Sequence, residues 1–120
     1  IFNNCDIIII ATDLNTSSFN IINKKTINDF KNNPLIVNIG RGGSIDSKAL
    51  LQCLKKKKIR GACLDVFDVE PLAKNSLFKK YTNCILSSHN AFNTKDEVEF
   101  VNRNTLNNIF KGSNLNAENI

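Results

Sequence analysis

A run of four isoleucines, Ile7 to Ile10, constrains the fold more than any other feature of the sequence. The run is continuous rather than alternating, a pattern that is typical of a strand buried on both faces, as in a parallel sheet. Three more apolar runs of strand length follow it along the chain. The strands are expected at 6–11, 35–39, 61–66 and 83–87. Because helical or turn-rich stretches separate these strands, the pattern predicts an α/β fold with a parallel sheet.

The stretch between the first two strands predicts a short helix at 23–31, with Ile27 and Phe30 turned inward. Pro34 ends this helix, because proline cannot continue a helix and disfavours helical geometry at the residue before it.

Asp46 is the expected N-cap of a second helix, at 47–57. This helix ends in the lysine run 55–58, which supplies much of the net charge of +5. Lysines at a helix C-terminus complement the helix dipole, so one interpretation is a solvated helix end. A nucleic-acid site is the alternative, but no aromatic residues are interleaved with the lysines as a single-strand binder would need. We therefore expect no nucleic-acid partner.

The segment 94–97, Thr-Lys-Asp-Glu, has the capping-box pattern, and apolar residues then recur at helical spacing. This last helix is expected to end at Lys111, with Gly112 as its C′ residue. The chain is thus divided into an α/β part at 1–92 and a C-terminal helix and tail at 93–120.

Composition excludes several classes of protein. Apolar residues make up 42% of the chain, which argues against disorder. No apolar run approaches the ~20 residues that cross a bilayer, so we expect no membrane association. The four cysteines lack metal-ligand spacing and are interpreted as small buried thiols, which favours a cytoplasmic location. The chain has no initiating methionine or signal pattern, and we expect it to begin inside a longer protein.

Three ionisable residues, Arg41, Glu70 and His89, follow successive predicted strands, at the edge where parallel sheets bind ligands. Arg41, set among glycines, presents a planar fork that suits a carboxylate, although a surface arginine with a local ion pair is the alternative. His89 is the only histidine and the one side chain that titrates near neutrality. It is either an acid–base group or a structural residue. Glu70 beside an imidazole would keep that imidazole protonated; alone, it would be a solvated acid.

Asp65 ends the third predicted strand. It would either accept a hydrogen bond from an amide-bearing ligand such as nicotinamide or cap the following turn. Thr12 and Ser18 are loop hydroxyls after the first strand and carry a weaker signal.

Three stretches together resemble one family: Asn38-Ile39-Gly40-Arg41-Gly42-Gly43-Ser44-Ile45-Asp46, then Gly61 to Glu70-Pro71, then Ser87-Ser88-His89. On these residues the chain resembles the C-terminal half of the NAD-binding domain of D-isomer-specific 2-hydroxyacid dehydrogenases, from about Cys5 to Gly112. The resemblance implies a Rossmann-type sheet, NAD as cofactor with NADP as the alternative, a small 2-hydroxy or 2-oxo acid as substrate, and a homodimer.

The resemblance also implies roles for single residues. Arg41 would bind the substrate carboxylate, His89 would donate and accept the proton, and Glu70 would pair with His89. Asp65 would meet the nicotinamide carboxamide. The expected cofactor-binding residues are Thr12, Ser18, Ile39, Gly40, Arg41, Asp65 and His89.

The sequence departs from the pattern of the family at three places. Asp13 stands where a proline is usual, and an acid there is expected to repel cofactor phosphates. Ser88 precedes His89 where the family has a proline. No G-x-G-x-x-G occurs in the chain, so these residues alone are expected to bind NAD poorly or not at all. The expected function is that of a phosphoglycerate-dehydrogenase-like enzyme, and the alternative is a non-catalytic, NAD-sensing corepressor on the same fold.

Overall fold

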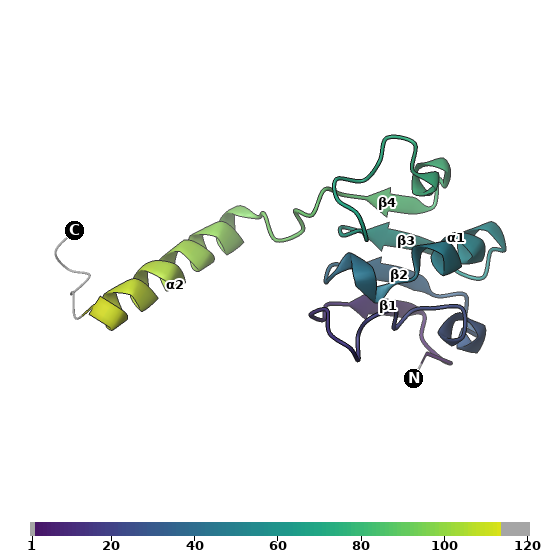
Figure 1. The fold of residues 1–120 in the computed structure, drawn as a ribbon, viewed down its shortest axis with the longest axis horizontal. Coiled ribbons are helices and arrows are strands. Elements are labelled where there is room, and N and C mark those ends of the chain that lie inside the picture. The colour runs from purple at the N-terminus through teal and green to yellow at the C-terminus, as the bar shows by residue number, and fades with distance from the viewer. Residues whose placement is uncertain (1, 114–120) are drawn as a thin grey trace. The chain divides into compact units, whose positions relative to one another are not determined.

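The computed structural model describes residues 2–113, which form two compact units that divide between His89 and Asn90. The first unit is built on one four-stranded sheet, in which strands β1 (Ile7–Ile10), β2 (Leu35–Asn38), β3 (Gly61–Leu64) and β4 (Cys84–Leu86) follow one another in chain order (Figure 1). All three pairings are parallel. The parallel α/β sheet predicted from the apolar runs is confirmed.

The core of the first unit lies on one face of this sheet. When parallel strands follow chain order, right-handed crossovers place every connection on the same face. The connections are the 3₁₀ turn η1 (Thr26–Asp29), the helix α1 (Ser47–Lys55) and the 3₁₀ turn η3 (Leu77–Lys80). They bury one cluster with the inward side of the sheet, whose members include Ile8, Ile10, Ile22, Ile27, Ile36, Leu50, Leu54, Ala62, Leu64 and Phe78.

The opposite face of the sheet is open among the described residues. Ile7, Ile9 and Ile85 are 53%, 63% and 69% exposed. The expectation that the isoleucine run is buried on both faces is therefore wrong for the part of the chain that the structure describes. The reason is topological, because an unreversed strand order leaves no described crossover on the second face.

The helix expected at 23–31 is also wrong, since only the single 3₁₀ turn η1 forms there. The Asn23 side-chain oxygen accepts hydrogen bonds from the backbone N–H groups of Lys25 and Thr26, at 2.8 and 3.2 Å, in the geometry of a helix cap. The turn nevertheless ends at Asp29, because Phe30 takes an extended conformation with ψ of 113°. The predicted inward residues still face the core, Ile27 buried and Phe30 half-buried.

The N-cap of α1 is confirmed. The Asp46 carboxylate accepts hydrogen bonds from the N–H groups of Lys48 and Ala49, at 3.0 and 3.2 Å. Such a cap satisfies two of the backbone donors that a helix start leaves unpaired.

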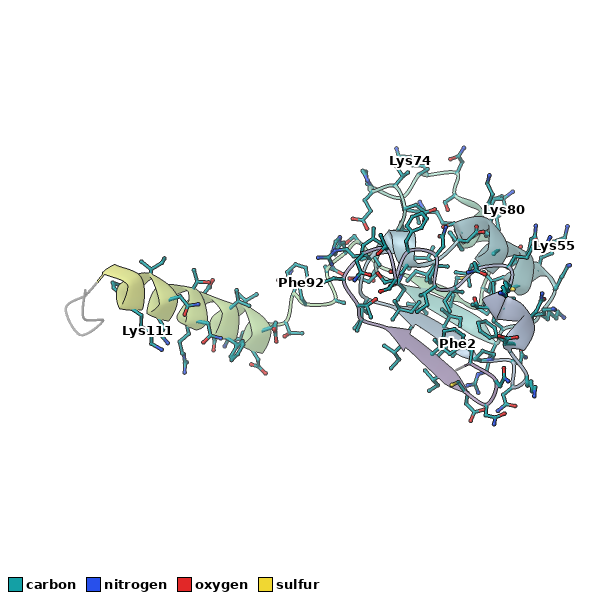
Figure 2. The ribbon with its side chains drawn as sticks, turned by 60° about the horizontal axis from the view of Figure 1, so that its bottom comes forward. Phe2, Lys55, Lys74, Lys80, Phe92 and Lys111 are labelled. Atoms are coloured by element: carbon teal, nitrogen blue, oxygen red, sulfur yellow. The ribbon has the colours of Figure 1, made fainter. Side chains whose placement is uncertain are left out.

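The C-terminus of α1 comes earlier than expected, at Lys55 rather than residue 57. Lys57 adopts a left-handed conformation with φ of 54°. Its N–H donates to the Leu54 carbonyl, and the Lys58 N–H donates to the Cys53 carbonyl, at 3.1 and 2.9 Å. This pair of bonds is a Schellman motif with a lysine where glycine is usual. The lysines of this helix end are exposed, and Lys55 lies on the outer surface of the unit in Figure 2.

The second unit contains the helix α2 (Lys95–Ser113). The predicted cap is confirmed, because the Thr94 hydroxyl accepts a hydrogen bond from the Glu97 N–H at 3.2 Å. The predicted end at Lys111 is wrong, since the helix continues through Gly112, which does not take the left-handed conformation of a C′ glycine. The expected tail lies outside the described residues beyond Ser113. No helix of the described part is both long and apolar enough to cross a bilayer.

Candidate active site

The sheet brings four of the predicted residues to one edge, at the carboxyl ends of adjacent parallel strands. Thr12 follows β1, Arg41 follows β2, Asp65 follows β3 directly, and His89 follows β4. Ile39, the first residue after β2, is 47% exposed at this same edge. Ligands of open α/β sheets bind at this edge.

The strongest feature of the edge is a pair between Glu70 and His89. His89 Nδ1 lies 2.8 Å from Glu70 Oε2, and the two side chains are 43% and 35% exposed respectively. Glu70 Oε1 accepts a hydrogen bond from the Phe67 N–H at 2.9 Å. The Phe67 N–H first, and the His89 side chain second, hold the pKa of Glu70 below its ordinary value of 4.5. The carboxylate therefore stays ionised near neutrality and keeps a proton on Nδ1, so Nε2 is the ring nitrogen that a substrate would meet.

The backbone of His89 is held by Asp65. The His89 N–H donates to the Asp65 carbonyl at 2.8 Å, and His89 has a positive φ of 58°. A left-handed backbone conformation is uncommon in a non-glycine residue, and such residues are enriched at functional sites. Asp65 itself is buried, at 4% exposure, and its Oδ1 accepts a hydrogen bond from the Ser87 hydroxyl at 2.5 Å.

The turn that carries Arg41 is anchored from within by Asn38. Asn38 is 1% exposed, and its side chain accepts from the Gly40 N–H at 3.1 Å and donates to the Arg41 carbonyl at 3.0 Å. A Cβ at Gly42 would lie 2.0 Å from the carbonyl carbon and oxygen of Phe67, so only glycine fits there. The Arg41 turn is thus seated against the loop that ends in Glu70. The guanidinium is exposed, and its Nη1 donates to the Gly40 carbonyl at 2.8 Å.

The loop after β1 is shaped by Ser18. This buried hydroxyl donates to the Asp13 carbonyl at 2.6 Å and accepts from the Asn15 N–H at 2.9 Å. The exposed Thr12 contributes its backbone, because a Cβ at Gly40 would lie 2.7 Å from the Thr12 carbonyl oxygen. Ser18 therefore shapes the loop through internal hydrogen bonds, and the main chain of Thr12 brings the loop close to the Arg41 turn.

A cavity of about 690 Å³ adjoins the Glu70–His89 pair, a volume that suits a small organic ligand. The cationic side chain of Lys79 lines this cavity together with Glu70 and His89. Arg41 is not among its described lining residues. The lining residues are Phe67, Glu70, Pro71, Leu72, Lys79, Leu86, Ser87, Ser88 and His89.

Sequence reasoning missed three residues of this edge: Asn38, Ser87 and Lys79. Asn38 and Ser87 had a signal, because each is a polar residue at the carboxyl end of an apolar strand. The Asn38 side chain reaches the turn after its own strand, and the Ser87 side chain reaches the end of the adjacent strand β3. Lys79 had no signal, since its position in the cavity depends on how the long connection between β3 and β4 folds back.

The fold and the edge together define a Rossmann-type segment that carries a carboxylate–imidazole pair. The family model described as "D-isomer specific 2-hydroxyacid dehydrogenase, NAD binding domain" matches residues 1–91. The chain belongs to this family of NAD(P)-dependent oxidoreductases, which confirms the resemblance seen in the sequence.

Individual relatives agree with this assignment. The chain is similar to a glyoxylate reductase of Thermofilum pendens, with 36% identity over 84 residues that cover 70% of this chain and 25% of the relative. It is 41% identical over 91 residues to a D-3-phosphoglycerate dehydrogenase of Methanocaldococcus jannaschii, covering 76% of this chain and 17% of the relative. The NADPH-dependent glyoxylate/hydroxypyruvate reductase of Sinorhizobium meliloti, solved with NADP and sulfate, has a TM-score of 0.81 and 26% identity, covering 96% of this chain and 38% of that one. The chain thus spans about a quarter or less of the length of these two curated relatives.

Proposed function

We propose that these residues are the acid–base segment of a longer NAD-dependent D-2-hydroxyacid dehydrogenase. Such an enzyme moves a hydride between nicotinamide and C2 of a 2-hydroxy or 2-oxo acid. The observation that carries the proposal is the 2.8 Å contact between His89 Nδ1 and Glu70 Oε2 at the binding edge of a parallel sheet. An imidazole held by a carboxylate is a proton donor to a carbonyl and a proton acceptor from a hydroxyl.

In this proposal His89 Nε2 gives a proton to the substrate oxygen in reduction and takes it back in oxidation. Glu70 keeps the imidazole oriented, because its lowered pKa leaves the carboxylate ionised and able to accept a hydrogen bond from Nδ1. Arg41 binds the substrate carboxylate through its guanidinium fork, and its exposure leaves the side chain able to turn from the Gly40 carbonyl to an incoming anion.

The residues present suit the nicotinamide half of NAD. Ile39 offers an exposed apolar surface, and Asp65 supplies a buried carboxylate next to the His89 backbone. Gly40 lets the Arg41 turn pack against the backbone of Thr12. Bound NAD supplies the hydride donor or acceptor. A G-x-G-x-x-G turn is lacking in the sequence, so the proposal assigns the pyrophosphate contacts to polypeptide outside these residues.

The substrate that we propose is 3-phosphoglycerate-like. Lys79 supports this choice, because it places a cation in the cavity beside His89, where a second anionic group would bind. The Methanocaldococcus relative is named for that substrate, whereas the Thermofilum relative is named for glyoxylate. A homodimer and a cytoplasmic location stay predictions from the sequence.

The test is turnover by the full-length protein that carries these residues. Reduction of phosphohydroxypyruvate, glyoxylate and pyruvate with NADH and NADPH would be followed by absorbance, and the ratio of kcat/KM values identifies the substrate. His89→Gln is expected to lower kcat by about 10²–10⁴-fold, while the surface change Lys31→Gln leaves it unchanged. NAD binding without turnover of any of these acids would favour the corepressor alternative.

A second test uses the 120 residues alone. We expect calorimetric titration with NAD to give little or no heat of binding, because the phosphate-binding turn is absent. A micromolar dissociation constant for these residues alone would contradict that part of the proposal.

A further inference from the structure

We propose that Ser87 is a positioning residue that aims the Asp65 carboxylate at the carboxamide of the nicotinamide ring. This inference rests on the proposed function, since it needs the nicotinamide to lie at this edge of the sheet. Ser87 is an ordinary strand-end serine in the sequence, and only the structure connects it to the cofactor side of the site.

The contact is a short hydrogen bond. The Ser87 hydroxyl donates to Asp65 Oδ1 over 2.5 Å. Asp65 is only 4% exposed, so its carboxylate depends on protein donors rather than on bulk water. A donor fixed on one carboxylate oxygen sets the rotation of the whole group, and hence the direction in which it accepts further hydrogen bonds.

Ser87 is itself held in place by the sheet. Its N–H donates to the Leu64 carbonyl at 3.0 Å, which extends the pairing of β3 and β4 by one step beyond the last paired residues. The register of two strands therefore determines the backbone position from which the hydroxyl reaches Asp65.

Asp65 connects the two halves of the proposed reaction. Its carboxylate is fixed by Ser87, and its carbonyl accepts the N–H of His89 at 2.8 Å. Asp65 thus supplies both the carboxylate that would hold the nicotinamide and the carbonyl that fixes the backbone of His89, the residue that would move the proton. Ser87 acts through Asp65 and does not touch the reacting atoms.

The test is cofactor binding by the full-length protein in the absence of substrate. Calorimetry would compare NADH with its 3-acetylpyridine analogue, which has a methyl group where the carboxamide has its NH₂ and so offers no N–H to Asp65. Ser87→Ala is expected to raise the dissociation constant of NADH about tenfold, the effect of losing one hydrogen bond. The same change is expected to alter the dissociation constant of the analogue less than about twofold, because the analogue cannot make the hydrogen bond to Asp65 that Ser87 would orient.

A matched pair of variants separates the hydroxyl from the shape of the side chain. Ser87→Thr keeps the hydroxyl and is expected to bind NADH as the parent protein does. Ser87→Val has nearly the same side-chain volume as Ser87→Thr but lacks the hydroxyl, so it is expected to behave as Ser87→Ala. Equal losses for NADH and the analogue, or NADH binding retained by the valine variant, would overturn the inference while leaving the proposed function intact. A parent protein that binds neither NADH nor NADPH would overturn both.

Discussion

Replacing Asn38 by alanine tests the account of how the Arg41 turn is held. The side chain is 1% exposed and makes two hydrogen bonds, one from the Gly40 N–H at 3.1 Å and one to the Arg41 carbonyl at 3.0 Å. Alanine removes both bonds and leaves a buried N–H at Gly40 without its partner. Each lost bond costs about 1 kcal/mol net, and an orphaned buried group adds about 1–2 kcal/mol more. We therefore expect a loss of about 3 kcal/mol in the free energy of unfolding, a large share of the ~5–15 kcal/mol of an ordinary domain.

Urea denaturation followed by far-UV circular dichroism measures this loss. With a slope of about 2 kcal/mol per M, the midpoint is expected to fall by about 1.5 M. Asn83→Ala is the matched control, because the Asn83 side chain also donates to a backbone carbonyl, that of Arg60 at 3.0 Å, but on the surface. The control is expected to lose less than about 1 kcal/mol. Equal midpoints for the two variants would refute the reasoning, since burial and the second bond would then contribute nothing.

Three further changes have directions that follow from the structure. The buried Ser44 hydroxyl has no hydrogen-bond partner among the described residues, so Ser44→Ala is expected to raise the urea midpoint by the equivalent of about 1 kcal/mol; a lower midpoint would mean that the hydroxyl is paired. Lys57→Gly is expected to raise the thermal midpoint by about 4–8 °C, because glycine relieves about 1 kcal/mol of strain at φ of 54°, whereas Lys56→Gly, at a φ of −85°, is expected to lower it. The pKa of Glu70 is lowered by the Phe67 N–H and then by His89. Its contribution to stability is therefore complete above 4.5 and lost as the pH falls through the folded-state pKa. The stability difference between the parent and Glu70→Gln is expected to shrink on acidification below pH 4.5, and a constant difference would contradict the pairing.

The sequence predicted most of the sheet and both helix starts, because these depend on local signals. Four apolar runs become four strands, since short, β-branched apolar runs between turn signals favour strands. Asp46 and Thr94 cap their helices through bonds to N–H groups two or three residues ahead, so no distant part of the chain is needed to form them.

The wrong predictions concern where helical geometry stops. The expected helix at 23–31 has the right apolar spacing and a capping side chain at Asn23, but only one 3₁₀ turn forms, because Phe30 already takes an extended conformation with ψ of 113°. The two helix ends were misplaced for a similar reason, because Lys57 accepts the left-handed conformation expected of a glycine, and Gly112 does not adopt it. Residue identity alone therefore does not decide where a helix ends, and such boundaries vary by one or two residues.

The sequence predicted which residues lie at the site, but not which side chains bond to one another there. Glu70 and His89 are 19 positions apart, and strand polarity explains why their ends meet. What strand polarity omits is the register between strands, and register decides that Ser87 reaches Asp65. The contact of Asn38 with the Arg41 carbonyl is local, but it depends on the conformation of the turn that follows β2 and not on the strand pattern.

The strand register also fixes the relative positions of the residues that follow the carboxyl ends of the strands. Parallel pairing continues past the strand ends, because the Asp65 N–H donates to the Asn38 carbonyl at 3.0 Å and the His89 N–H donates to the Asp65 carbonyl at 2.8 Å. A slip of β4 by one residue would move His89 by about 3.3 Å along the strand and turn alternate side chains to the other face. A shift of that size exceeds the 2.8 Å separation of His89 Nδ1 and Glu70 Oε2, so the acid–base pair would be lost. The buried, inward-facing residues that pair with β4, such as Ala62 and Leu64, therefore help to set the proton-transfer geometry even though they lie in the core and not at the edge.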